Sequence, residues 1–161
     1  MPNTYPSFIT FKMSTIYFKL NSENAVLSNL WTLPSNLISF HGYKWPSIEH
    51  AYQCEKLSHH NLFSPSVCEF FIHCTPMQAM FKAKQLLPTC AIKQSWKDKQ
   101  VSVMWELLKI KAQVCPSFKE AILQPGQFVE DTNHMFWGRG VNGKGRNMLG
   151  RLMCKLRRTL D

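Results

Sequence analysis

The sequence predicts an α+β fold that is mainly helical, compact and built with a small β-sheet. Apolar residues recur at helical spacing through most of the chain, prolines separate these segments, and strand-like segments lie mostly near the two ends. The 161 residues, 45% of them hydrophobic, suffice for one domain with a sizeable core. We expect that domain over residues 13–161, after a leader of residues 1–12 that is a candidate for disorder.

Three segments are candidates for strands. Residues 14–20 alternate between polar and apolar side chains, which is typical of a half-buried strand. Residues 37–40 and 127–131 are shorter candidates of the same kind. Together they predict one small sheet.

Prolines mark where the helices in the middle of the chain begin and end. The first helix is predicted to open at Pro46 and the second at Pro65, where the missing N–H of proline costs least. The third begins with a capping box over residues 75–78 and ends at Pro88. The apolar stripes are Val67, Phe70, Phe71 and Cys74 in the second helix, and Met80, Ala83 and Leu87 in the third.

Two longer amphipathic helices and one short helix complete the prediction. The longest runs over residues 96–114 and stops at Cys115-Pro116, after which the short helix follows. The last runs over residues 147–160, with arginines opposite its apolar stripe. The two stripes are Val101, Met104, Trp105, Leu108 and Ala112, and Leu149, Leu152, Met153, Leu156 and Leu160.

Composition and residue spacing limit the classes of protein to which this chain can belong. The chain has no run of about 18 apolar residues and no signal-peptide pattern, so we expect an intracellular, cytoplasmic protein without a membrane partner, with nucleus and organelles left open. Its six cysteines form no C-x-x-C pair, which favours buried reduced thiols. No metal-ligand spacing is present, and we expect neither a metal nor a cofactor.

The net charge of +9 is concentrated near the C-terminus, where residues 138–161 hold seven basic side chains and one acidic side chain. Such a surface suits phosphate-bearing partners, from nucleotides to nucleic acid. An ordinary solvated helix face is the alternative beyond Arg151.

The helix after Pro46 carries one acid and one amine, Glu49 and Lys56, seven residues apart. At 100° and 1.5 Å per residue they lie on nearly the same face, about 10 Å apart, with Tyr52 and Gln53 between them. That face can hold both ends of a small reacting centre. By composition alone, a solvated helix face is the competing interpretation.

A glycine-rich loop, residues 138–145, contains the letters G-x-G-x-x-G but comes too late for a dinucleotide-binding turn, since 16 residues remain after it. Its backbone N–H groups could still face a phosphate, helped by Lys144 and Arg146. Alternatively, its glycines only permit positive φ. Trp96 and Trp137 could stack on a flat heterocycle, although a tryptophan taken singly is more often a core residue.

Four ordered motifs between residues 25 and 160 resemble those of the NADAR, or YbiA-like, N-glycosidase family. They are Val26-Leu-Ser-Asn-Leu30, Gly42-Tyr-Lys-Trp-Pro-Ser-Ile-Glu-His50, Trp137-Gly-Arg-Gly140 and Gly145-Arg-Asn-Met-Leu-Gly150. The resemblance implies the compact, mainly helical YbiA-like fold. It also implies hydrolysis of an N-glycosidic bond, either between ADP-ribose and guanine or in phosphorylated riboflavin-pathway intermediates.

The resemblance also implies roles for residues. Cleavage develops positive charge at the anomeric carbon and negative charge on the departing nitrogen, so Glu49 is the candidate acid/base. Lys56 either pairs with Glu49 and a phosphate or attacks as an amine to form a Schiff base. Asn29 would orient the sugar, and Trp96 and Trp137 would hold the base. The remaining substrate-binding candidates are Gly138, Lys144, Arg146 and Asn147.

This chain departs from the family pattern at four positions, Ala83, Lys93, His134 and Arg139. The last two replace common aspartates, which favours a more anionic ligand such as ADP-ribosylated nucleic acid; reduced activity on the riboflavin precursor is the alternative. The sequence therefore predicts an N-glycosidase for an ADP-ribosylated nucleobase, with a phosphoribosyl heterocycle as the alternative substrate. A non-catalytic ADP-ribose or nucleic-acid binding module is a third hypothesis, which the retention of Glu49 and Lys56 disfavours.

Overall fold

The computed structural model describes residues 13–160, so the predicted leader lies outside the described residues. Six α-helices dominate this part of the chain: α1 (Ile48–His59), α2 (Pro65–His73), α3 (Pro76–Leu86), α4 (Gln94–Val114), α5 (Pro116–Leu123) and α6 (Met148–Leu160). The strands are β1 (Thr15–Phe18), β2 (Ile38–Phe40), β3 (Tyr43–Trp45) and β4 (Gln127–Glu130). Short 3-10 turns, η1 (Ala25–Leu27), η2 (Pro34–Asn36), η3 (Thr89–Ala91) and η4 (Val141–Gly143), join them. The mainly helical α+β prediction is confirmed.

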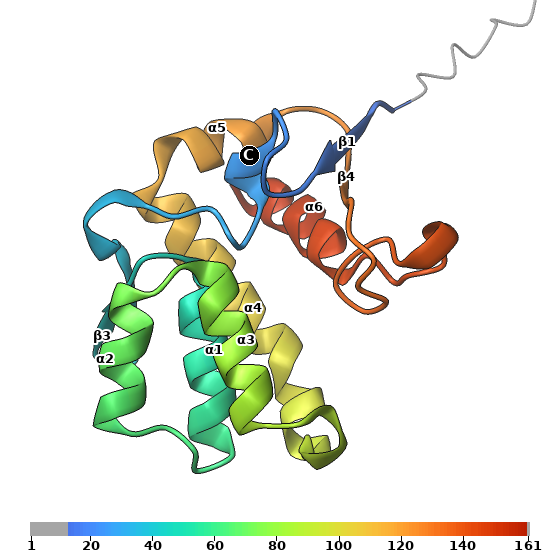
Figure 1. Cartoon of the computed structure of the whole chain (residues 1–161). Helices are drawn as coiled ribbons and strands as arrows, with labels where there is room; N and C mark the ends of the chain where they lie inside the picture. The colour runs from blue at the N-terminus through green and yellow to red at the C-terminus, as the bar shows by residue number, and fades with distance from the viewer. Residues whose placement is uncertain (1–12, 161) are drawn as a thin grey trace, which may run out of the picture.

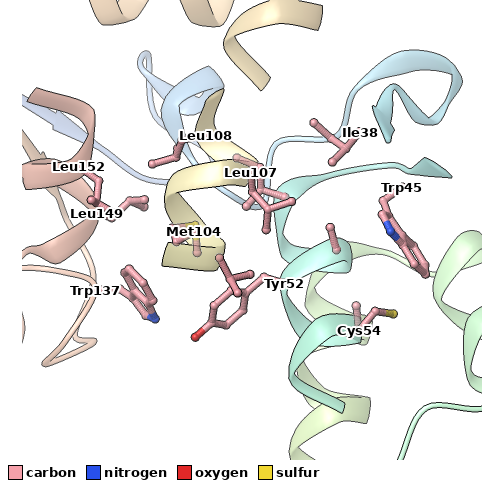
Figure 2. Packing of buried hydrophobic residues seen from close by; sticks show 14 of the residues in the cluster. Ile38, Trp45, Tyr52, Cys54, Met104, Leu107, Leu108, Trp137, Leu149 and Leu152 are labelled. Atoms are coloured by element: carbon pink, nitrogen blue, oxygen red, sulfur yellow. The ribbon is translucent and has the colours of Figure 1, made fainter. Parts of the chain in front are cut away.

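The helices α1 to α4 pack together on one side of the molecule, and α5, α6, β1 and β4 lie on the other (Figure 1). The long helix α4 connects the two sides, because it contacts α1 and β2 as well as α5 and α6. The buried cluster between them includes Met104 of α4, Leu149 of α6 and Tyr52 of α1 (Figure 2). Helix α1 is therefore placed where both halves meet.

The strands form two sheets of two strands each, so the prediction of one sheet is wrong. β1 pairs with β4 in parallel, with Thr15 opposite Gln127 and Phe18 opposite Glu130. β2 pairs with β3 in antiparallel fashion, and β3 was not predicted. The sequence signal for this hairpin is His41-Gly42, whose positive φ values of 47° and 84° suit a tight two-residue turn.

The helix starts follow the predicted prolines with one exception. Pro65 occupies the first turn of α2, and Thr75 and Gln78 form the capping box of α3, with 3.2 and 2.8 Å hydrogen bonds. The prediction that α1 opens at Pro46 is wrong, because α1 begins at Ile48. The carbonyl of Pro46 accepts a 2.7 Å bond from the Leu33 N–H, which holds Pro46 outside the helix.

Two predicted apolar stripes are rotated in the structure. In α2 the predicted Phe71 is buried, but Phe70 is 41% exposed and Cys68, outside the predicted stripe, is buried. In α4 the buried face passes through Lys111, a residue outside the predicted stripe. All six cysteines are free, but the expected burial holds only for Cys54, Cys68 and Cys115, since Cys74 and Cys154 are partly buried and Cys90 is exposed. Among the helices of residues 13–160, none combines the length and the apolar character that a membrane crossing requires.

Candidate active site

Glu49 lies in the first turn of α1 and is almost completely buried, with 9% of its surface exposed. Its backbone N–H donates to the Asn29 carbonyl at 3.1 Å, and its Oε1 accepts a 2.7 Å hydrogen bond from Gln53 Nε2. Burial raises the pKa of Glu49, while Gln53 and the charge of Lys56 oppose the rise. Glu49 therefore holds its proton to a higher pH than an exposed glutamate does, which suits a group that exchanges a proton with a ligand.

Lys56 lies two turns further along α1 and is half-buried. Burial lowers the pKa of its amine, and the charge of Glu49 partly offsets this. Among the ion pairs formed by residues 13–160, none joins Lys56 to Glu49. The two groups thus sense each other's charge without a direct salt bridge, which leaves the amine available to a ligand.

Tyr52, between the two, is the centre of an aromatic cluster. Its ring lies 5.4 Å from Trp96 and 5.7 Å, edge to face, from Trp137, and its hydroxyl donates to Gln100 Oε1 at 3.2 Å. Figure 2 shows the rings of Tyr52 and Trp137 next to each other beside Met104. Burial raises the pKa of Tyr52 well above its usual value, so the phenol stays neutral and donates its hydrogen bond to Gln100.

The two tryptophans differ in their exposure and in the aromatic rings that they contact. Trp96 is 1% exposed and packs against Tyr52 and also against His59, at 5.7 Å. Trp137 is 8% exposed and also packs edge to face on Phe136, at 4.8 Å. Both tryptophans are core residues bordering the Glu49–Lys56 face, and contact with a base stays a prediction for each.

Asn29 borders the same centre from the loop after η1. It is 6% exposed, and its Nδ2 donates to Met104 Sδ at 3.4 Å. Its Oδ1 is buried and accepts no hydrogen bond from any described residue. The structure therefore brings Asn29 to Glu49 with an acceptor still unused.

Six of the backbone amides in the loop over residues 138–145 are bonded within the protein and are not free for a phosphate, so phosphate binding by this loop stays a prediction. Gly138, Arg139, Gly140, Gly143, Lys144 and Gly145 all donate their N–H groups to backbone carbonyls. The start of α6 is also closed, because Met148 and Leu149 donate to the carbonyls of Phe136 and Trp137 at 3.1 Å each. Gly140 and Gly143 have φ values of 67° and 72°, which agrees with the alternative that the glycines permit positive φ.

The other loop candidates serve packing in this structure. Asn147 clamps β4, accepting from Glu130 N–H at 3.0 Å and donating to the Phe128 carbonyl at 2.8 Å. Lys144 and Arg146 are exposed, and the Arg146 guanidinium lies 5.0 Å from the Phe136 ring. Neither cation contributes to the shifted pKa of Glu49 or Lys56. Ligand contacts by these side chains stay predictions.

Sequence reasoning missed Glu130, the last residue of β4. Burial and the charge of Glu49 raise its pKa to about 7, and the Thr132 hydroxyl partly offsets the rise. Its Oε2 is buried without a hydrogen bond from any described residue. The available signal was an acidic residue seven positions before Trp137 at the end of a predicted strand.

His134 also faces this centre. Its Nδ1 accepts the N–H groups of Phe136 and Trp137 at 3.2 and 3.1 Å, so its neutral form carries hydrogen on Nε2. Burial lowers the pKa of His134, and the charge of Lys56 lowers it further. Arg139, the other departure, pairs with Asp131 at 2.6 Å, which neutralises its charge locally.

Two buried polar residues near the site are structural anchors. His50 accepts from Ser47 Oγ at 2.8 Å through Nδ1 and donates to the Cys74 carbonyl at 3.0 Å, which ties α1 to the C-terminal end of α2. Lys111 donates to the carbonyls of Val26 and Ser28 at 2.7 and 2.9 Å, and so fixes the loop that leads to Asn29.

Two surface hollows lie elsewhere on the molecule. One of about 510 Å³ is lined by residues of α4, α5 and α6, and one of about 500 Å³ lies beside β1. Neither is lined by a predicted site residue. The candidate active site is instead the compact polar cluster of Glu49, Lys56, Glu130, His134 and Asn29.

The fold and this cluster define a family. The NADAR domain model matches residues 16–161, and the chain belongs to the NADAR family. Among curated relatives, the N-glycosidase YbiA of Shigella boydii is 27% identical over 147 residues, covering 89% of this chain and 86% of that protein.

A second relative comes from plants, and a solved structure shares the fold. The chloroplastic riboflavin biosynthesis protein PYRR of Zea mays is 29% identical over 124 residues, covering 71% of this chain; the matched part spans only 20% of that protein. The NMR structure of the E. coli protein YbiA superposes with a TM-score of 0.73 at 26% identity, covering 91% of this chain and 84% of that one. The expected YbiA-like fold is confirmed.

Proposed function

We propose that this protein is an N-glycoside hydrolase that releases ADP-ribose from an ADP-ribosylated guanine in nucleic acid or nucleotide. The observation that carries the proposal is the shared face of α1, where Glu49 is buried with one oxygen free of hydrogen bonds and Lys56 is buried enough to lower the pKa of its amine. The curated relative named N-glycosidase supports the reaction class. The net charge of +9 favours a polyanionic substrate.

The proposed reaction exchanges one bond at the ribose. The bond between C1′ and the base nitrogen breaks as the Lys56 amine bonds to C1′, and Glu49 gives the departing nitrogen a proton. Ring opening then yields a Schiff base, which water hydrolyses to release the sugar and regenerate the amine. If Lys56 instead only pairs with Glu49 and a phosphate, water attacks C1′ directly.

A phosphorylated riboflavin-pathway intermediate is the second candidate substrate. The similarity to the Zea mays protein named for riboflavin biosynthesis favours it. Both substrates carry a phosphorylated ribose joined to a nitrogen heterocycle, so the same acid and amine would serve. Supplying both substrates to the protein together and measuring which base is released faster distinguishes the two candidates.

The test compares base release by the wild type, Glu49→Gln and Lys56→Ala, using ADP-ribosylated guanine DNA and the pyrimidine intermediate separately. We expect Glu49→Gln to lower the rate about 10²- to 10⁴-fold, because general acid–base catalysis contributes that much. The matched controls are Glu69→Gln and Lys84→Ala, two exposed residues of α2 and α3 that should leave the rate unchanged.

Two results decide between mechanisms. Borohydride added during turnover should trap a covalent adduct in the wild type and none in Lys56→Ala; turnover without an adduct contradicts the Schiff-base route. Tight binding of ADP-ribose without release from either substrate would refute hydrolysis and support the binding module.

A further inference from the structure

Lys111, in the last turn of α4, is a completely buried lysine without a carboxylate partner. Its side chain has 0% of its surface exposed, and none of the ion pairs found within residues 13–160 includes it. Burial also lowers the pKa of its amine to about 7. A cation in the interior is costly unless dipoles of the protein compensate it, so the contacts of Lys111 show what it holds.

The groups that compensate this cation are two backbone carbonyls and one aromatic ring. Lys111 Nζ donates to the carbonyls of Val26 and Ser28 at 2.7 and 2.9 Å. It also lies 4.6 Å from the centre of the Phe118 ring, on α5. Val26 lies in η1 and Ser28 directly follows it, so a single amine joins the end of α4 to a loop more than eighty positions earlier in the chain.

This loop leads directly into the candidate active site. Asn29 follows Ser28, and its carbonyl accepts the N–H of Glu49, in the first turn of α1, at 3.1 Å. The side chain of Asn29 donates to Met104 Sδ at 3.4 Å, and Met104 lies seven residues before Lys111 on the same face of α4. Helix α4 therefore holds the loop at two points, and the loop in turn contacts the start of α1.

We propose that Lys111 is a positioning residue for the reaction, which acts through Asn29 by fixing the peptide that precedes it. Asn29 Oδ1 is buried in this arrangement and accepts no hydrogen bond from a described residue. An acceptor held in that state suits a hydroxyl of the sugar, the contact expected of Asn29. The inference rests on the proposed function for its catalytic meaning, whereas the hold of Lys111 on the loop is a property of the protein alone.

The experiment measures kcat and KM for base release in the wild type, Lys111→Met, Asn29→Ala and the double variant. Methionine keeps an unbranched buried side chain but cannot donate to the two carbonyls. We expect Lys111→Met to lower kcat about 10²-fold with little change in KM, because a small displacement of a group that orients the substrate can cost that much. Asn29→Ala should cost a similar factor, and the double variant should lose no more than either single variant.

Arg157 provides a matched control, because it makes the same kind of contact elsewhere in the fold. Its guanidinium donates to the carbonyls of Gln124 and Gly126 at 2.7 and 2.8 Å. Arg157→Met removes two hydrogen bonds to backbone carbonyls, as Lys111→Met does, but should leave kcat unchanged. Losses that add in the double variant of Lys111 and Asn29, or an equal loss of kcat in Arg157→Met, would overturn the positioning role.

Amide hydrogen exchange measures the hold on the loop without any substrate. The Glu49 N–H, which donates to Asn29, should exchange about five- to tenfold faster in Lys111→Met than in the wild type, the size expected when roughly one hydrogen bond is weakened. The Ala79 N–H donates to the Thr75 carbonyl at 2.9 Å at the start of α3 and should exchange at an unchanged rate. Equal exchange of Glu49 in the two proteins would overturn the inference.

The exchange measurement also separates this inference from the proposed function. A wild type that releases no base refutes the proposed function, and the exchange of Glu49 then still decides whether Lys111 positions the loop. Should Lys111→Met fail to fold, Lys111→Gln takes its place, because glutamine retains N–H donors on a side chain one bond shorter. We expect smaller changes of the same sign in kcat and in exchange, and a Lys111→Gln variant equal to the wild type in both would overturn the inference.

Discussion

At the scale of single residues, the two oxygens of Glu49 are not equivalent. Gln53, one turn along α1, donates to Oε1, while Oε2 accepts no hydrogen bond from a described residue. Gln53 thus restricts the orientation of the carboxyl group and leaves Oε2 without a protein donor. The sequence placed Gln53 on the reacting face but gave no sign of this orienting bond.

Replacing Gln53 by leucine should raise the pKa of Glu49 further, because the hydrogen bond that stabilises the carboxylate is lost. Glu49 then stays protonated to a higher pH, so any change in activity that depends on the ionisation of Glu49 occurs at a higher pH. The measurement is the Glu49 midpoint by carboxyl NMR, with the exposed Gln94→Leu as the control. A midpoint that falls would contradict the orienting role.

His134 supports a second prediction, on the amine. Aspartate at this position can accept the same two N–H groups, but its charge would raise the pKa of Lys56. His134→Asp should therefore reduce borohydride trapping at pH 7 and recover it at higher pH. His134→Asn keeps an acceptor without a charge and should resemble the wild type; equal losses in both variants would point to a disrupted loop instead.

At the scale of elements, the closing motifs of the chain connect β4 to α6. Asn147 has a φ of 47°, and its side chain accepts from the Glu130 N–H and donates to the Phe128 carbonyl. The N–H groups of Met148 and Leu149, at the start of α6, donate to the carbonyls of residues 136 and 137. These contacts hold Trp137 and Glu130 in register with each other.

Asn147→Gly should weaken this junction while permitting the positive φ. Two hydrogen bonds are lost, and at about 1 kcal/mol each the free energy of unfolding should fall by about 2 kcal/mol. Urea unfolding measures the change, with the exposed Asn133→Gly as the control. A loss below that of the control would show that the clamp is dispensable.

Local signals predicted most elements but not the contacts between them. Proline and capping residues located α2, α3 and α5, and alternation located β1, β2 and β4. The pairing of β1 with β4 joins residues more than one hundred positions apart, which no local pattern encodes. Glu49 and Lys56 could be found from the sequence because both lie on one helix. Glu130 was missed because its position relative to Glu49 depends on tertiary packing.

At the scale of the whole molecule, the shifted pKa values of the partly buried Glu130 and the buried Lys111 have opposite effects on stability. The folded chain holds a proton on Glu130 between about 4.5 and 7 that the unfolded chain has lost, so the free energy of unfolding falls as pH rises through that window. Burial lowers the pKa of Lys111 to about 7, so above that value the free energy of unfolding rises with pH.

Glu130→Gln should remove the first of these dependences. From pH 4.5 to pH 8 the variant should gain on the order of 3 kcal/mol relative to the wild type, the size expected from the shifted pKa of Glu130. Urea unfolding at the two pH values measures the difference, and Glu120→Gln should show none. A constant difference between variant and wild type would contradict a proton held by Glu130.

The parallel pairing of Thr15–Phe18 with Gln127–Glu130 has a consequence for biosynthesis. The helices that bear Glu49 and Lys56 leave the ribosome early, but the first strand must wait for translation to pass residue 130 before it finds its neighbour. A nascent chain therefore cannot pair these strands until β4 has been made. A premature stop codon before β4 would leave a helical fragment that lacks the second carboxyl.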